Sequence, residues 1–302
     1  NLQPEKTIDY EVGFKQTLSK SSALTISAYY RELRDMIQVQ NVLYAFPVTY
    51  LNFGNLDFGT VKGFSLSYDL RRTKNVSLNV NYTLQFADGS GSSATSGLNL
   101  IASGQPNLRT ILPLSFDQRH TLVAVLDYRY GAGAAYNGPT WWGKKVFENA
   151  GANFTFRLGS GTPYSRQSNP LQAAAIGINQ RPILRGQING SRLPWQFRID
   201  MRLNKTFDLA WGAKEEGQKQ KRASLNVYLD VQNLLNTKNV IGVYRYTGNP
   251  DDDGWLSSAE AQEIIANQVN SQSYRDLYSV KVNNPANFTL PRRMRLGVQI
   301  NF

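Results

Sequence analysis

Apolar and polar residues alternate with a period of two along most of this chain. The strictest run covers residues 76–86, where every second side chain from Val76 to Phe86 is apolar or aromatic. Alternation of this kind predicts strands with one apolar face. Nine such strands are predicted, with almost no helix: Ile8–Leu18, Leu24–Val39, Phe64–Leu70, Val76–Phe86, Leu122–Tyr130, Ala152–Leu158, Trp195–Asn204, Leu225–Gln232 and Met294–Phe302.

The length of these strands separates two all-β architectures. Several are ten residues or longer, whereas strands of soluble proteins usually have about 5 to 6 residues. About 9 to 11 residues cross a bilayer when the strand is tilted. The polar face also carries mid-strand Arg198 and Asp200, as a water-facing lumen would. A soluble β-sandwich alternates too and stays an alternative, but strand length favours a transmembrane antiparallel β-barrel.

Short and long connections alternate along the chain. An outer-membrane barrel has short periplasmic turns at one rim and long extracellular loops at the other. If Phe302 ends on the periplasmic side, all four long links fall outside. The links are short at Ser19–Ser22 and Arg72–Asn75, intermediate at Gly131–Gly151 and Asp208–Arg222, and long at Gln40–Gly59, Ala87–Phe116, Gly159–Leu193 and Asn236–Pro291.

Composition excludes several function classes. The 302 residues have a mean hydropathy of −0.40, and no run reaches the ~20 apolar residues of a membrane-spanning helix. The absence of cysteine excludes disulfides and thiolate chemistry. The net charge of +11 comes from scattered Lys and Arg residues, so we expect no nucleic-acid binding.

The strand count predicts an incomplete barrel. Bacterial single-chain barrels have an even number of strands, and nine is odd. The chain also starts without Met. We therefore expect residues 1–302 to form the C-terminal portion of one larger outer-membrane barrel, without its plug and earlier strands.

Several stretches resemble TonB-dependent outer-membrane receptors, in style those of the Oar-like Bacteroidetes type. They are LQPEKTIDYEVGFKQTLS, LTISAYYRELRDMI, YLNFGNLDFGTVKGFSLSYDL, SGTPYS, LPWQFRIDMRLNKTF and LNVYLDVQNLLNTKNV, in that order, with Phe302 at the end. The resemblance implies nine of 22 strands, an N-terminal plug and a TonB contact outside this chain. It also implies that Phe302 serves as an outer-membrane assembly signal.

The function implied by this resemblance is energy-coupled transport rather than catalysis. The receptor would bind a nutrient in its extracellular loops and import it with inner-membrane energy, its partners being membrane lipid, the rest of the barrel, the plug and TonB. The ligand-binding residues are unknown. A barrel that docks a surface lipoprotein or an exported protein, and a passive porin, stay as alternatives.

One segment of the long loop 236–291 matches a calcium-binding pattern. Calcium takes six to eight oxygen ligands, and a twelve-residue loop supplies them at fixed positions. A capping box of Ser257 and Glu260 predicts a short helix, Ser257–Gln268, after it, and Tyr244–Tyr246 before it is predicted as strand. A plain acidic turn is the alternative. The expected Ca²⁺ ligands are Asn249, Asp251, Asp253, Trp255 (through its carbonyl), Ser257 and Glu260.

The remaining candidates have simpler interpretations beside the functional ones. His120, the only histidine, lies three residues from Asp117, but no nucleophile motif accompanies them, so we expect no enzyme. The aromatic surplus fits interface girdles, for example Trp141, Trp142 and Trp195. Loop aromatics contact either a ligand or each other: Tyr44, Phe46, Tyr164, Trp255 and Tyr274. An inward basic row either pairs with acids or attracts an anionic ligand: Arg198, Arg202, Arg293 and Arg295.

Overall fold

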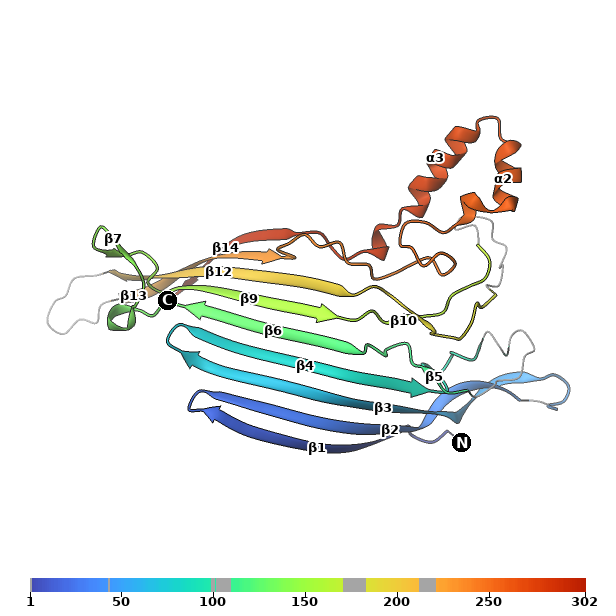
Figure 1. The fold of residues 1–302 in the computed structure, drawn as a ribbon, viewed down its shortest axis with the longest axis horizontal. Helices are drawn as coiled ribbons and strands as arrows, with labels where there is room; N and C mark the ends of the chain where they lie inside the picture. Colours follow the sequence, from blue (N-terminus) through green and yellow to red (C-terminus); the bar gives the residue numbers. More distant parts are fainter. Residues whose placement is uncertain (1, 43, 99–100, 102–109, 171–182, 212–220) are drawn as a thin grey trace.

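The computed structural model describes the chain except residues 1, 43, 99–100, 102–109, 171–182 and 212–220. Nine long strands form one antiparallel sheet in which each strand pairs with its neighbours along the chain (Figure 1). The order confirms the nine predicted strands. They are β1 (Lys6–Ser19), β2 (Ser22–Val42), β3 (Tyr50–Thr73), β4 (Val76–Gly89), β6 (His120–Arg129), β9 (Ala150–Gly159), β12 (Gln196–Trp211), β13 (Lys221–Gln232) and β14 (Arg293–Asn301).

The prediction of a loop over Gln40–Gly59 is wrong for most of that range, which is paired strand. β2 has 21 residues and β3 has 24, and their pairing continues from Leu33↔Gly59 to Val42↔Tyr50. The register shifts between Leu33 and Ile37, where Asp35 has a φ of 57°. A β-bulge of this kind breaks the two-residue period, so the outer halves of both strands do not show in the alternation.

The sheet has an apolar face and a polar face. Because paired residues of antiparallel strands share a face, the register puts Leu296, Leu229, Leu203, Ala152 and Tyr128 in one apolar row across five strands. On the other face, Arg295 lies opposite Asp230.

No second layer of strands or helices among the described residues covers the apolar face. Val12 of β1 is 74% exposed and Leu296 of β14 is 72% exposed. A soluble protein does not present so large an apolar surface, so this arrangement excludes the β-sandwich. It is the arrangement of a barrel wall that meets lipid outside and water inside.

Connections of two kinds lie at opposite ends of the sheet (Figure 1). We call the first end the turn rim: it holds the links β1–β2, β3–β4, β6–β9 and β12–β13. In the β1–β2 turn, Ser19 Oγ accepts hydrogen bonds from the backbone N–H groups of Ser21 and Ser22, at 3.2 and 3.1 Å. The β6–β9 link contains η1 (Gly133–Ala135), β7 (Thr140–Trp141) and β8 (Lys144–Lys145).

The opposite end, the loop rim, holds the longer connections. They carry β5 (Leu112–Pro113), β10 (Pro163–Tyr164), β11 (Ser191–Arg192), η2 (Trp255–Ser257), α2 (Ala259–Ala266), α3 (Ser271–Val282) and η3 (Pro285–Asn287). The links β4–β6, β9–β12 and β13–β14 are long as predicted, but the link between Val42 and Tyr50 is shorter than the β6–β9 link of the turn rim. Among the described residues, no helix has the length and hydropathy to cross a membrane.

Candidate functional site

The candidate functional residues lie at the loop rim. The largest connection there is the segment 233–292, which we call the helical loop. Asn233 closes this loop at its base and is only 2% exposed. Its Nδ2 donates to the carbonyls of Thr237 and Leu290, at 3.0 and 3.1 Å, and its Oδ1 accepts from the Thr237 N–H at 2.9 Å. The entry and exit of the loop are therefore joined by one side chain.

A second asparagine fixes the helical loop to the sheet. Asn239 Oδ1 accepts a 2.8 Å hydrogen bond from the Phe197 N–H, and its Nδ2 donates to the Phe197 carbonyl at 2.9 Å. Asn239 thus pairs with the start of β12 as a neighbouring strand would. The loop rises from a rigid base.

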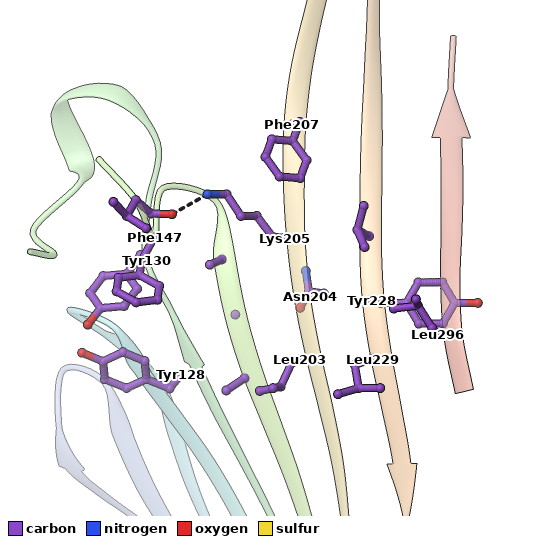
Figure 2. Close-up of a pocket in the computed structure, with 15 residues that line it drawn as sticks. Tyr128, Tyr130, Phe147, Leu203, Asn204, Lys205, Phe207, Tyr228, Leu229 and Leu296 are labelled. Carbon is purple, nitrogen blue, oxygen red and sulfur yellow. Dashed lines mark hydrogen bonds between the residues drawn. The ribbon is translucent and has the colours of Figure 1, made fainter. Parts of the chain in front are cut away.

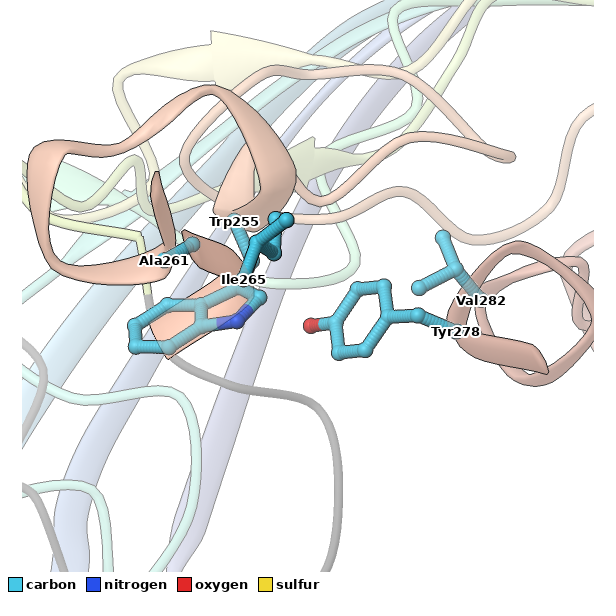
Figure 3. Close-up of a cluster of buried hydrophobic side chains, with 5 residues drawn as sticks. All are labelled: Trp255, Ala261, Ile265, Tyr278 and Val282. Carbon is cyan, nitrogen blue, oxygen red and sulfur yellow. The ribbon is translucent and has the colours of Figure 1, made fainter. Parts of the chain in front are cut away.

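The helical loop has its own hydrophobic core (Figure 3). Trp255, Ala261, Ile265, Tyr278 and Val282 are all buried in it. These side chains come from η2, α2 and α3, so the core joins the two helices to the turn before them.

The predicted start of α2 needs a correction. Ser258, not Ser257, is the N-cap, and its Oγ accepts from the Ala261 N–H at 3.2 Å. The capping box is wrong because η2 takes up Ser257 and delays the helix by one position. α3 was not predicted. Tyr244–Tyr246 is not a strand, since a hydrogen bond from the Gly248 N–H to the Tyr244 carbonyl closes a turn there.

Two tyrosines bring polar groups into this core. The Tyr278 hydroxyl donates to Asp253 Oδ2 at 2.5 Å, while the Trp255 N–H donates to Asp253 Oδ1 at 3.0 Å. The Tyr244 hydroxyl donates to the Val282 carbonyl at 2.7 Å. Burial, aided by the negative charge of Asp253, raises the pKa of Tyr244.

The six predicted calcium ligands have different surroundings in the fold. Both oxygens of Asp253 accept hydrogen bonds from the loop core, and the Trp255 carbonyl accepts from the N–H and Oγ of Ser258 at 2.9 and 2.7 Å. Asp251, Ser257 and Glu260 are exposed. The Asn249 carbonyl accepts from the Tyr244 N–H.

This loop does not assemble a calcium cage as it is folded. Within the described ranges no group of three or more His, Cys, Asp or Glu side chains is arranged to hold a metal ion. Calcium stays a prediction, and a calcium ion would compete for the Trp255 carbonyl with the two donors of Ser258.

The loops of the rim are linked to each other. Arg166 Nη2 donates to the Tyr246 carbonyl at 3.3 Å, and the Gln167 N–H donates to the Arg245 carbonyl at 3.1 Å. Asp117 is almost fully buried and accepts from the Ala87 N–H and from Arg192. Three loops therefore form one hydrogen-bonded body.

A pocket of about 430 Å³ opens in this body, on the polar face of the sheet. Gln38, completely buried, donates to Asp57 Oδ2 at 2.8 Å and to Ser96 Oγ at 2.9 Å. Ser90 Oγ donates to the other oxygen of Asp57 at 3.0 Å. Serines and glycines make up about half of the lining residues, but most of the lining surface is apolar, as in small-molecule sites where a few polar groups orient the ligand. Sequence reasoning missed this pocket because its lining residues are far apart in the chain and form no local motif: Gln38, Ser90–Gly97 and Ile188–Asn189.

His120 and Asp117 do not form a catalytic pair. His120 lies between Tyr82, whose hydroxyl is 2.9 Å from Nδ1, and Trp195, whose ring centroid is 5.3 Å from the imidazole centroid. Asp117 instead holds Arg192. The stack Tyr82–His120–Trp195 fits the interface girdle that the aromatic residues indicated.

The inward basic residues mostly have structural partners. Arg198 and Arg157 both bond Asp200, Arg295 Nη2 lies 3.0 Å from Asp230 Oδ2, and Arg202 covers the Tyr228 ring at 4.4 Å. These contacts favour the pairing interpretation of the row. Of the loop aromatics, Trp255 is buried in the loop core, whereas Tyr44 and Phe46 are fully exposed next to the β2–β3 hairpin tip.

A family model described as "TonB dependent receptor-like, beta-barrel" matches residues 1–234. No curated protein matches the chain. The outer membrane transporter YddB from Escherichia coli is similar, with a TM-score of 0.50 at 14% identity, over 80% of this chain and 30% of that chain.

Two further solved structures have lower scores. FpvA from P. aeruginosa, solved bound to heterologous pyoverdines, has a TM-score of 0.47 at 11% identity, over 82% of this chain and 25% of that chain. The ferric-catecholate import receptor Fiu from E. coli K12 has 0.44 at 16% identity, over 81% and 26%. The chain thus spans less than a third of each of these proteins.

Proposed function

Because the chain belongs to the TonB dependent receptor-like β-barrel family, we propose that it is the C-terminal barrel portion of a transporter that binds a nutrient and imports it with inner-membrane energy. Proteins of this family lie in the bacterial outer membrane, and so does this chain. In such barrels the longer loops face outward, which puts the loop rim outside the cell.

The observation that carries the proposal is the linked body of loops with its pocket on the polar face. A porin needs loops that leave its channel open, whereas a receptor needs a preformed surface that recognises one ligand. Asn233, Asn239 and Asp117 give this rim the rigidity of such a surface. The pocket between Gln38, Ser93 and Asn189 supplies a largely apolar lining with a few polar groups, which would orient a small nutrient.

Energy coupling would require partners outside these residues. We propose a plug inside the barrel and contact of TonB with a segment other than residues 1–302. The remaining strands would close the lipid-facing wall, because open sheet edges are not tolerated in hydrocarbon.

The test uses the full-length protein in its own cells. Mass spectrometry would record which compounds disappear from a defined medium in three strains: parent, gene deletion and TonB inactivation. We expect at least one compound to be depleted only when both the gene and TonB are active. Depletion that persists without TonB would indicate a porin, and identical media in all three strains would contradict transport.

A pocket variant makes the test specific. Ser115→Trp places a large ring at the pocket lining and should lower uptake by about tenfold or more, the effect of losing ~1.4 kcal/mol of binding. Ser279→Trp, on the exposed surface of α3, is the matched control and should leave uptake unchanged. Equal uptake by both variants would remove the pocket from the mechanism.

One observation favours the second candidate, docking of a surface lipoprotein or an exported protein. Leu277 and Val280 lie one turn apart on α3 and are strongly exposed, on the side away from buried Tyr278. Exposed apolar side chains on a loop helix suit a protein partner. Chemical cross-linking on intact cells should capture a lipoprotein with the parent and lose it with Leu277→Asp; no difference would eliminate this candidate.

A further inference from the structure

The β6–β9 connection, residues 130–149, is unusually long and aromatic for the turn rim. The neighbouring turns β1–β2 and β3–β4 need only a few residues. This connection contains the β7–β8 hairpin, with Trp142 at its tip 98% exposed and Trp141 largely exposed beside it. Two exposed tryptophans at a barrel rim are typical of the level where lipid headgroups begin.

Part of the connection stands beside the apolar face, where Figure 2 shows Phe147 next to Tyr130, while β7 projects beyond the strand ends (Figure 1). Lys205 Nζ, on the apolar face of β12, donates a hydrogen bond to the Val146 carbonyl. The ring of Phe147 stacks on Tyr130 with the centroids 5.9 Å apart. These contacts hold Val146 and Phe147 as a wall that stands beside the strands.

A groove of about 690 Å³ lies between this wall and the sheet, within the size range of small-molecule sites. Its floor is formed by the small residues Ala150, Gly151 and Ala152 of β9. Leu203 and Leu229 flank the floor from the next two strands. Small residues beside large ones produce the trough, and nearly all of its lining is hydrocarbon.

Two lysines, Lys144 and Lys145, come directly before the wall residues in the same connection. Lys144 is exposed in β8, and Lys145 Nζ reaches the Gly133 carbonyl at 2.6 Å. Two acids of this region also have hydrogen-bond donors: Glu148 accepts from the Gly133 N–H and Asp208 accepts from Asn149 Nδ2. Lysine stems lie on apolar surface while their ammonium groups reach the polar boundary.

We propose that this groove binds one glycerophospholipid of the periplasmic leaflet, with an acyl chain between Phe147 and Ala152 and the phosphate beside Lys144 and Lys145. The groove continues the lipid-facing surface of the barrel, and the turn rim of such a barrel faces the periplasm. An apolar trough in hydrocarbon is filled by a lipid chain. The lysines of the same connection would pair with a phosphate attached to that chain. The site does not depend on which nutrient the loop rim binds.

Native mass spectrometry of the full-length receptor tests the site. The protein is released from nanodiscs that contain phosphatidylglycerol and is then stripped with increasing concentrations of a maltoside detergent. The parent should retain one phospholipid after the bulk lipid has gone. Ala152→Phe fills the groove and should lower the retained fraction by about tenfold.

Two variants keep the result interpretable. Phe147→Ser removes the wall from a connection rather than a strand and should also lose the lipid, whether or not Ala152→Phe assembles. Ala124→Phe, on the same apolar face of β6 but away from the groove, is the matched control and should retain the lipid. Heat-modifiable gel mobility confirms that each variant is folded.

The headgroup assignment has its own measurement. Lys144→Gln should release phosphatidylglycerol at a lower detergent concentration and leave binding of the sugar-headed maltoside unchanged. A parent without a retained lipid, or equal retention by parent, Phe147→Ser and Ala152→Phe, would overturn the site. If Lys144→Gln lost phospholipid and maltoside together, the lysines would have no role in selecting the headgroup. If the retained mass were that of a lipidated protein, the groove would not be a site for a free phospholipid.

Discussion

The Tyr278 hydroxyl donates a 2.5 Å hydrogen bond to Asp253 inside the core of the helical loop, 25 positions away in the sequence. Asp253 is 4% exposed and has a second donor in the Trp255 N–H. A buried carboxylate is tolerated only when donors satisfy it. The pair therefore joins α3 to the turn before α2.

Removing the donor should open the loop locally. Tyr278→Phe leaves the Asp253 carboxylate with one donor fewer, so we expect the free energy of local opening of α2 and α3 to fall by about 1.5 to 3 kcal/mol. Hydrogen exchange of the amides in both helices measures it. Asp251→Asn, at an exposed neighbour, is the control and should change it by less than about 0.5 kcal/mol. Equal protection in the two variants would contradict this role.

The loop should lose stability at alkaline pH. The pKa of Tyr244 is raised by burial, so the neutral phenol is favoured in the folded loop. Its contribution is fully present below the unfolded pKa of about 10 and is lost as the pH rises through the folded value. Proteolysis of the loop should therefore accelerate above pH ~10. Tyr244→Phe cannot ionise and should flatten this part of the profile; an unchanged profile would exclude Tyr244 as its cause.

Asn233 should control the base of the loop. It has a φ of 54°, so Asn233→Gly keeps the backbone conformation and removes only the side chain. We expect a loss of about 2 kcal/mol in local stability and faster cleavage of residues 236–291 by trypsin. Asn233→Asp keeps the acceptor for Thr237 but loses both donors, and should lie between the parent and Asn233→Gly. A Gly variant as resistant as the parent would contradict the proposed closure.

The calcium hypothesis is best tested at Asp251 alone. Asp253→Ala would damage the loop core with or without calcium, whereas Asp251 is exposed and serves only the predicted site. If calcium binds, millimolar calcium should slow trypsin cleavage of the parent and not of Asp251→Ala. Identical cleavage of the parent with calcium and with a chelator would rule out this site.

Phe302 should act in assembly rather than in transport. It follows β14 at the turn rim with its side chain exposed. Deleting it should lower the amount of heat-modifiable receptor several-fold and leave the ligand affinity of the assembled molecules unchanged. Phe302→Tyr keeps an aromatic terminus and should assemble normally. Normal assembly together with weaker ligand binding would reverse this assignment.

The sheet was predictable because its signal is local. Alternation in β4 and β13 reports the two faces directly, since each residue meets either lipid or water. The bulge near Asp35 hid the outer parts of β2 and β3, where the alternation changes phase.

The loop rim was predictable only in outline. The acidic turn and the helix after it were visible in the sequence, but the hydrogen bond from Tyr278 makes Asp253 part of a core rather than an open ligand. The pocket around Gln38 joins residues from separate loops. No local pattern predicts such contacts between distant residues, because they depend on long-range packing. The apolar groove depends in the same way on a wall that only the folded 130–149 connection supplies.

The separate core of the helical loop has a consequence for how this surface can change over time. Trp255 and Ile265 are buried against α3 and not against the sheet, so the loop folds as a cooperative unit above its asparagine base. Substitutions on the exposed surface of α2 and α3 are expected to alter what the loop presents, while its core and the strand ladder assemble as before. New surface specificities can thus arise in this loop without endangering the wall that carries it.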